Sequence, residues 1–150
     1  MLTLRTPEPD EAGRLTELCL RSKAAWGYDE AFLEACRAEL TLTPSALRHS
    51  HMKVADRDGT LVGMAQVTVE GEVAALEKLF VEPTRLHGGC GRALLEWAKD
   101  TARALGAAIL VIESDPGAAE FYRRMGAVDD GSVPSGSIPG RLIPRLTIAL

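Results

Sequence analysis

The chain has 150 residues, a formal net charge of −4, 46% hydrophobic residues and 25% charged residues. This composition predicts one globular domain over residues 1–150, with enough apolar residues for a sizeable core. The negative charge does not favour nucleic-acid binding, and no apolar stretch is long enough to indicate a membrane span. Three cysteines without C-x-x-C spacing argue against a disulfide or zinc framework and favour a reducing, cytoplasmic location.

The first third of the chain is predicted to hold one strand and two helices. Leu2–Arg5 alternates between apolar and polar residues, and the proline-containing segment after it is typical of a helix start. The first helix is amphipathic and breaks at Trp26–Tyr28. Asp29 is a suitable N-cap for the second helix, and Thr43–Ser45 is expected to end the pair.

From residue 51 onward the apolar residues follow the period of two that is typical of strands. Met52–Ala55 and Leu61–Val69 predict a hairpin whose turn is Asp58-Gly59. The next strand contains Leu76–Val81 and ends before a proline. These three strands are expected to pair in antiparallel fashion.

The second half is predicted to alternate helices and strands. After an amphipathic helix, Ala108–Ile112 is a buried strand and Pro116–Met125 a short helix. A polar loop is expected over Asp129–Gly140, and a last strand over Leu142–Leu150 that lies partly at an edge because it contains Pro144. The fold class is therefore α/β, of the α+β type: a mixed, mostly antiparallel sheet flanked by about four helices.

The segment from Leu76 to Leu95 has the order strand, glycine-rich loop, helix. Unpaired N–H groups and the helix dipole at such a helix start stabilise a bound phosphate, and glycines let the backbone approach it. A Walker loop would need Lys and then Ser or Thr after Gly91, and a dinucleotide loop would need a small residue at Leu94. Both alternatives fail at these positions.

This segment resembles the acetyl-CoA loop of the GNAT superfamily of N-acetyltransferases, where a V-x-P strand end precedes a Gly-x-Gly loop and paired leucines. Residues 112–126, I-E-S-D-P-G-A-A-E-F-Y-R-R-M-G, resemble the other signature of that family. The matching positions are Val81, Pro83, Gly89, Gly91, Leu94, Leu95, Ala118, Phe121, Tyr122 and Gly126. The departures are Leu86 for Arg or Gln, His87 for a frequent glycine, and Asp115 for Asn.

The resemblance implies a single GNAT-like domain with a splayed sheet, acetyl-CoA as cosubstrate and no metal. The strands Ala74–Val81 and Ala108–Ser114 would run parallel and diverge at a bulge, with the pantetheine arm between them. Arg85 or Arg92 is expected to replace the phosphate contact that Leu86 cannot make. The implied cofactor-binding residues are Leu79, Phe80, Val81, His87, Gly88, Gly89, Cys90, Gly91, Arg92, Asp115 and Ala118.

The resemblance further implies acetyl transfer to a primary amine by direct attack in a ternary complex, with Tyr122 as general acid. Its phenol is protonated at neutral pH and can donate to the departing thiolate; the alternative is a tyrosine that only packs in its helix. Glu77 is a candidate general base or else a solvated carboxylate, and Glu113 is a second candidate. A backbone N–H near Phe80 and Val81 is the expected oxyanion donor.

The amine acceptor is not readable from a motif, and both a small molecule and a peptide amine remain open. Trp26 and Tyr28 are candidate acceptor contacts, because the break between the first two helices overhangs the acceptor in this family and aromatic rings attract amines. Glu77 is a third candidate, as the possible base for the acceptor amine. The segment Ser135–Arg141 is the other expected wall. A monomer or homodimer is expected, with no nucleic-acid or membrane partner. The competing hypotheses are a non-catalytic acyl-CoA-binding sensor and a protein that binds another nucleotide or phosphate metabolite.

Overall fold

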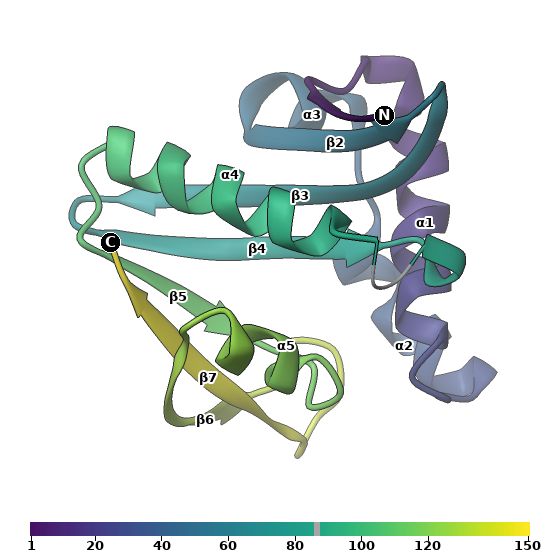
Figure 1. Cartoon of the computed structure of the whole chain (residues 1–150). Coiled ribbons are helices and arrows are strands. Elements are labelled where there is room, and N and C mark those ends of the chain that lie inside the picture. The colour runs from purple at the N-terminus through teal and green to yellow at the C-terminus, as the bar shows by residue number, and fades with distance from the viewer. Residues whose placement is uncertain (86–87) are drawn as a thin grey trace.

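A computed structural model describes the protein over residues 1–85 and 88–150, and these residues form one seven-stranded sheet covered by helices (Figure 1). The strands are β1 (Leu2–Arg5), β2 (His51–Arg57), β3 (Thr60–Glu70), β4 (Val73–Val81), β5 (Ile109–Glu113), β6 (Val128–Pro134) and β7 (Leu142–Ala149). The α-helices are α1 (Ala12–Ala24), α2 (Glu30–Leu40), α3 (Pro44–His49), α4 (Cys90–Ala104) and α5 (Ala119–Arg124). Within this described part, no helix is long and apolar enough to cross a membrane.

The sheet has the strand order β1-β2-β3-β4-β5-β7-β6. Only β4 and β5 pair in parallel, and the other neighbours pair in antiparallel fashion. Helix α4 connects β4 to β5 and lies over β3 and β4, whereas α5 lies beside β5 and β7 (Figure 1). The predicted mixed, mostly antiparallel sheet is therefore confirmed.

The two parallel strands separate part-way along their length. β4 pairs with β5 only over Val73–Ala75. Its other edge stays paired with β3 as far as Val81, with a register shift that leaves Glu77 as an extra residue in β4. Such a bulge bends its strand, and Figure 1 shows β5 and β7 turning away from the end of β4. The predicted divergence of these strands at a bulge is confirmed.

The bulge also divides the side chains of β4 between two apolar layers. Before it, Ala74 and Leu76 pack with α4 and α5; after it, Leu79 and Val81 occupy that side. Phe80 packs on the opposite face, against the cluster formed by α1, α2 and the middle strands. Because strand side chains alternate, one extra residue is what moves this face from even to odd positions.

One prediction for the C-terminal part is wrong. Residues 129–134, expected as the first part of a loop, belong with Val128 to the edge strand β6, in which every residue except Val133 is exposed. A strand with two exposed faces carries no apolar alternation, so its sequence has no strand signal. β7 lies between β5 and β6, but β5 pairs with it only over Arg145–Ala149, so the part of β7 that contains Pro144 has a ladder partner on one side only. The predicted partial edge at Pro144 is therefore confirmed. Pro144 is accommodated past the end of β5, where its carbonyl accepts a hydrogen bond from the Ser114 N–H at 2.9 Å.

The structure also has a helix that the sequence analysis missed. Thr43, expected to close the second helix, instead caps α3: its hydroxyl accepts a hydrogen bond from the Ala46 N–H at 3.1 Å. Pro44 occupies the first turn, where its missing N–H costs no hydrogen bond. At six residues, α3 is too short for helical periodicity to be recognised.

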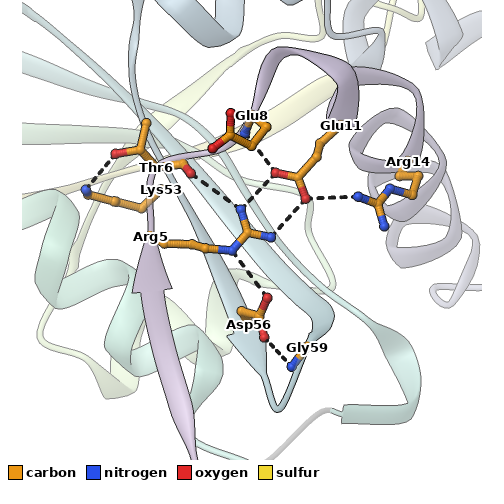
Figure 2. Close-up of polar contacts among 8 residues, drawn as sticks. All are labelled: Arg5, Thr6, Glu8, Glu11, Arg14, Lys53, Asp56 and Gly59. Atoms are coloured by element: carbon orange, nitrogen blue, oxygen red, sulfur yellow. Dashed lines mark hydrogen bonds and ion pairs between the residues drawn. The ribbon is translucent and has the colours of Figure 1, made fainter.

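A buried carboxylate anchors the start of α1 to the sheet (Figure 2). Glu11 accepts two hydrogen bonds from the Arg5 guanidinium, at 2.8 and 2.9 Å, and one from Arg14 at 3.1 Å. The Glu8 N–H adds a fourth at 2.8 Å. Arg5 also reaches Asp56 on β2 at 3.3 Å, so the network joins β1, β2 and α1. The hydrogen bonds from Arg5 outweigh burial and lower the pKa of Glu11 to about 2.

Candidate functional site

The loop between β4 and α4 has the backbone features of an anion site. Gly89 is the N-cap of α4 and has a φ of +83°, a left-handed conformation that glycine adopts without strain. Within the described residues no side chain caps this end of α4, so its first N–H groups remain available to an anion. A Cβ on Gly91 would lie 3.3 Å from Cζ of Phe121, which shows how closely α5 packs on the loop.

The other residues predicted to bind the cofactor in this loop have different environments. Gly88 is exposed and its carbonyl accepts a hydrogen bond from Arg57 at 3.3 Å. The Cys90 side chain is buried, which raises its pKa to about 11, so only its backbone faces the loop. Arg92 is exposed on the first turn of α4. Outside the described part lie Leu86, His87 and the side chain of Arg85.

Tyr122 lies in the apolar cluster at the point where β4 and β5 separate. It is 6% exposed and shares that cluster with Leu76 and Ile112, each one residue past the last paired position of its strand. Burial raises the pKa of Tyr122 well above its usual range. The phenol forms no hydrogen bond within the described residues. Because burial raises its pKa, it stays protonated at neutral pH.

Glu77, the extra residue of the bulge, is exposed and accepts a hydrogen bond from the Thr68 hydroxyl at 2.8 Å. It lines a cavity of about 100 Å³ whose wall also includes Glu113. The cavity lies between the separated strands, α1, α2 and the loop before β7. Its described lining residues are Lys23, Cys36, Glu39, Leu40, Glu77, Lys78, Phe80, Glu113, Asp115, Ser135, Gly136, Ser137, Arg141 and Ile143. The two alternative candidates for the general base, Glu77 and Glu113, therefore line the same cavity as residues of the predicted 135–141 wall.

Asp115 is the centre of a polar network at the rim of this cavity. Its Oδ2 atom receives the Tyr28 hydroxyl at 2.8 Å and pairs with the Lys23 ammonium at 2.9 Å, while Arg141 lies 3.9 Å away. Its Oδ1 atom accepts a hydrogen bond from the Gly117 N–H at 2.9 Å. Burial disfavours the charged carboxylate, but these hydrogen bonds and charges outweigh it, and the pKa of Asp115 is lowered.

The two aromatic residues expected to contact the acceptor have separate positions. Tyr28 stacks on Phe32 with ring centroids 3.9 Å apart, and the charged ends of Lys23 and Arg141 lie 5.6 and 5.2 Å from the Tyr28 centroid. Trp26 is 45% exposed and packs on Gly117, where a Cβ would come within 2.8 Å of its ring. Neither ring is among the described residues that line the cavity, so their contact with an acceptor stays a prediction.

Residues 16–127 match the acetyltransferase (GNAT) family. The chain belongs to this family. The residues matched begin in α1 and end just beyond α5, and they include both segments that carry the sequence resemblance. The resemblance and the assignment of the chain to the acyltransferase enzymes are confirmed.

Individual GNAT relatives agree with this assignment. A GCN5-related N-acetyltransferase from Rhodopseudomonas palustris has a TM-score of 0.82 and 26% identity, over 99% of this chain and 95% of that chain. PaiA N-acetyltransferase from Thermoplasma acidophilum, solved with coenzyme A, shares the fold at a TM-score of 0.78 and 18% identity, over 100% and 99% of the two chains. An IAA acetyltransferase from Azospirillum brasilense is 39% identical over 83 residues, about half of each protein: 52% of this chain and 54% of that one.

Several residues of this candidate site were missed by the sequence analysis. Lys23 and Arg141 meet at Asp115 although they are far apart in the chain, and Phe32 stacks under Tyr28. Their only sequence signal was general: Arg141 closes the loop expected to form the acceptor wall. Lys78 follows Glu77 directly, but the bulge that turns it into the cavity cannot be read from alternation.

Proposed function

We propose that the protein transfers acetyl from acetyl-CoA to a primary amine, by direct attack in a ternary complex and without an acyl-enzyme. The observation that carries this proposal is the opening of the sheet immediately after Ala75. At that opening β4 has an edge without a strand partner, and Glu77 lies in the bulge of that strand. Tyr122 of α5 packs in one cluster with Leu76 and Ile112, the first residues of β4 and β5 past the separation. GNAT membership supports the reaction class.

Acetyl-CoA fits the backbone of this opening. Leu79, Phe80 and Val81 hold the pantetheine arm through N–H and C=O groups on the free edge of β4, much as an added strand would be held. The pyrophosphate is bound by the uncapped N–H groups from Gly88 to Arg92 at the start of α4. Ala118, the N-cap of α5, supplies a further backbone contact. The related PaiA enzyme is itself a complex with coenzyme A.

Asp115 takes part differently from the asparagine that it replaces in the family pattern. Both of its carboxylate oxygens already accept hydrogen bonds from protein groups. We therefore assign its side chain to the wall between cofactor and acceptor, and its cofactor contact to the backbone.

The chain's own groups complete the chemistry. Glu77 removes a proton from the acceptor ammonium, directly or through water, so that the neutral amine attacks the thioester carbonyl. Backbone N–H groups near Phe80 and Val81 stabilise the oxyanion. When the carbon–sulfur bond breaks, Tyr122 donates its proton to the sulfur. The cationic nitrogen then loses its second proton to the Tyr122 phenolate, which restores the neutral phenol and leaves the amide product. A phenol kept neutral by burial is suited to this step, because it is protonated throughout the working pH range.

A mixed primary-amine panel with acetyl-CoA, followed by release of free CoA thiol, tests this proposal. Thiol release that depends on the amine, with a stoichiometric acetylated product, is the expected result. Tight acetyl-CoA binding without turnover of any amine would instead identify a non-catalytic acyl-CoA-binding module. Thermal-shift measurements with CoA, ATP and NAD separate both outcomes from a protein that binds another nucleotide. A ligand raises the melting temperature only if it binds the folded state, so the nucleotide that raises it identifies the class of ligand.

A further inference from the structure

The charged side chains that line the cavity fall into two groups. Most have a partner: Lys23 and Arg141 share the Asp115 carboxylate, Glu39 pairs with the Ser137 hydroxyl, and Glu77 with Thr68. Within the described residues, only Lys78 and Glu113 form neither a side-chain hydrogen bond nor an ion pair. Glu113 is exposed and keeps most of its hydration, whereas Lys78 is half-buried and loses hydration that no side chain among the described residues replaces.

These two side chains come from the two strands that separate. Lys78 lies on β4, directly after the bulge, and Glu113 is the last residue of β5. Both line the same cavity, yet they lie more than 4.0 Å apart, since no ion pair joins them. Arg145, opposite Glu113 on β7, is itself paired with Asp130. The cavity therefore has three carboxylates that form no ion pair within the described residues, Glu77, Glu113 and Glu39 across from them on α2, and one cationic residue without a partner, Lys78.

Lys78 points toward the acceptor side of the sheet rather than toward α4. Its neighbour Phe80, two positions along the strand, packs against α1 and α2, so Lys78 lies on the same face. Its charge also acts on Cys19 of α1, where it opposes the rise in the pKa of that buried thiol. The ammonium is thus remote from the α4 loop assigned to the pyrophosphate, and a phosphate of the cofactor is not its partner.

We propose that the acceptor is a small amino acid-like zwitterion, whose amine faces Glu77 and Glu113 and whose carboxylate pairs with Lys78. This inference rests on the proposed acetyltransferase function. The shared cluster of Lys23, Asp115 and Arg141 carries one net positive charge and adds to the attraction for the carboxylate. A diamine would place a second ammonium where the carboxylate is expected, beside Lys78, and the two positive charges would repel each other.

The size of the cavity agrees with a small acceptor. Its volume of about 100 Å³ is below the range of about 300–1,000 Å³ typical of pockets for drug-sized ligands. A compact amine with a nearby carboxylate can span the two separated strands, whereas a large aminoglycoside-like molecule would remain mostly outside.

The test compares each of the proteinogenic L-amino acids with its carboxamide, which keeps the amine and removes the carboxylate. We expect kcat/KM for the best amino acid to exceed that of its carboxamide by about 10- to 100-fold, as for a charge-assisted hydrogen bond. Lys78→Met should bring this ratio close to one, and Lys78→Arg should restore most of it. Lys78→Glu should favour diamines over amino acids. Lys99→Met, which removes the same charge from α4, is the matched control.

The outcomes separate this inference from the proposed function. Carboxamides or diamines acetylated as well as amino acids, or a preference that survives Lys78→Met, would overturn the inference and leave the acetyltransferase intact. No turnover of any amine would overturn both. Calorimetric titration measures the affinity for the preferred amino acid independently of turnover. Equal affinity in the wild type and in Lys78→Met would also reject the role of Lys78. Circular dichroism melts verify that each variant folds.

Discussion

The Tyr28 hydroxyl donates a hydrogen bond to Asp115 Oδ2 across 2.8 Å, although the two residues are 87 positions apart in the chain. This bond joins the α1–α2 connection to the turn that follows β5. Lys23 and Arg141 meet the same carboxylate, so α1 and the loop before β7 are fixed at the same point. The rim of the cavity therefore depends on one charge.

Replacing Asp115 with asparagine should lower the stability of the fold. Tyr28 and Gly117 donate to different carboxylate oxygens, and the single amide oxygen can accept from only one of them. Lys23 and Arg141 also lose their shared counter-charge. The Asp115 side chain is only 9% exposed, so we expect a loss of about 1–3 kcal/mol in the free energy of unfolding, measured by urea titration. Asp129→Asn, which breaks an exposed pair with Arg123, should cost less than about 0.5 kcal/mol. Equal effects in the two variants would contradict the special position of Asp115.

Tyr122→Phe separates catalysis from packing. The phenol has no hydrogen-bond partner within the described residues, so the variant should keep its melting temperature and its affinity for acetyl-CoA. The loss of the proton donor should lower kcat by about 10- to 1,000-fold. Steady-state kinetics and calorimetric titration of acetyl-CoA check the two halves. An unaltered kcat with a good acceptor would reduce Tyr122 to a core residue.

Two glycines near the starts of their helices, Gly91 in α4 and Gly13 in α1, offer a matched pair of substitutions. A side chain larger than alanine at Gly91 must displace the Phe121 ring, which is already 3.3 Å from an ideal Cβ. We expect Gly91→Val to weaken acetyl-CoA binding by at least about 10-fold by moving the α4 start, judged by calorimetry. Gly13→Ala in α1 meets no atom within 4 Å and should instead stabilise the protein by about 0.5–1 kcal/mol. Unchanged acetyl-CoA affinity in Gly91→Val would argue against the phosphate site.

The sequence predicted the elements whose patterns are local. Asp29 and Asp58-Gly59 were expected to cap or turn the chain, and the structure has them in those roles. The same holds for the glycine loop, because a strand, three glycines and an amphipathic helix are contiguous. What could not be predicted is non-local or lacks a pattern. The exposed strand β6 has no apolar face to detect, and the cluster at Asp115 is assembled from four separate segments.

The bulge at Glu77 shows the limit most clearly. Strict alternation would put Glu77 and Leu79 on one face, but the extra residue sends Leu79 toward α4 while Glu77 and Lys78 both reach the cavity. The sequence alone identified Glu77 as a candidate base and passed over Lys78. Only the register of β3 against β4 reveals that the two charges share a wall.

The acid limb of stability should depend on Glu11. Its pKa is lowered from 4.5 to about 2 in the folded protein, so it stabilises the fold above about pH 4.5 and loses that contribution as the pH falls toward 2. The shift corresponds to a stabilisation of about 3 kcal/mol at neutral pH. Solvent screens this interaction little, because the Glu11 side chain is only 4% exposed. Glu11→Gln should therefore lower the free energy of unfolding at pH 7 and flatten its decline between pH 5 and 2. Glu70→Gln, at an exposed position of β3, should leave both unchanged. A wild-type profile that is flat over this range would show that Arg5 and Arg14 do not hold the carboxylate in its charged form.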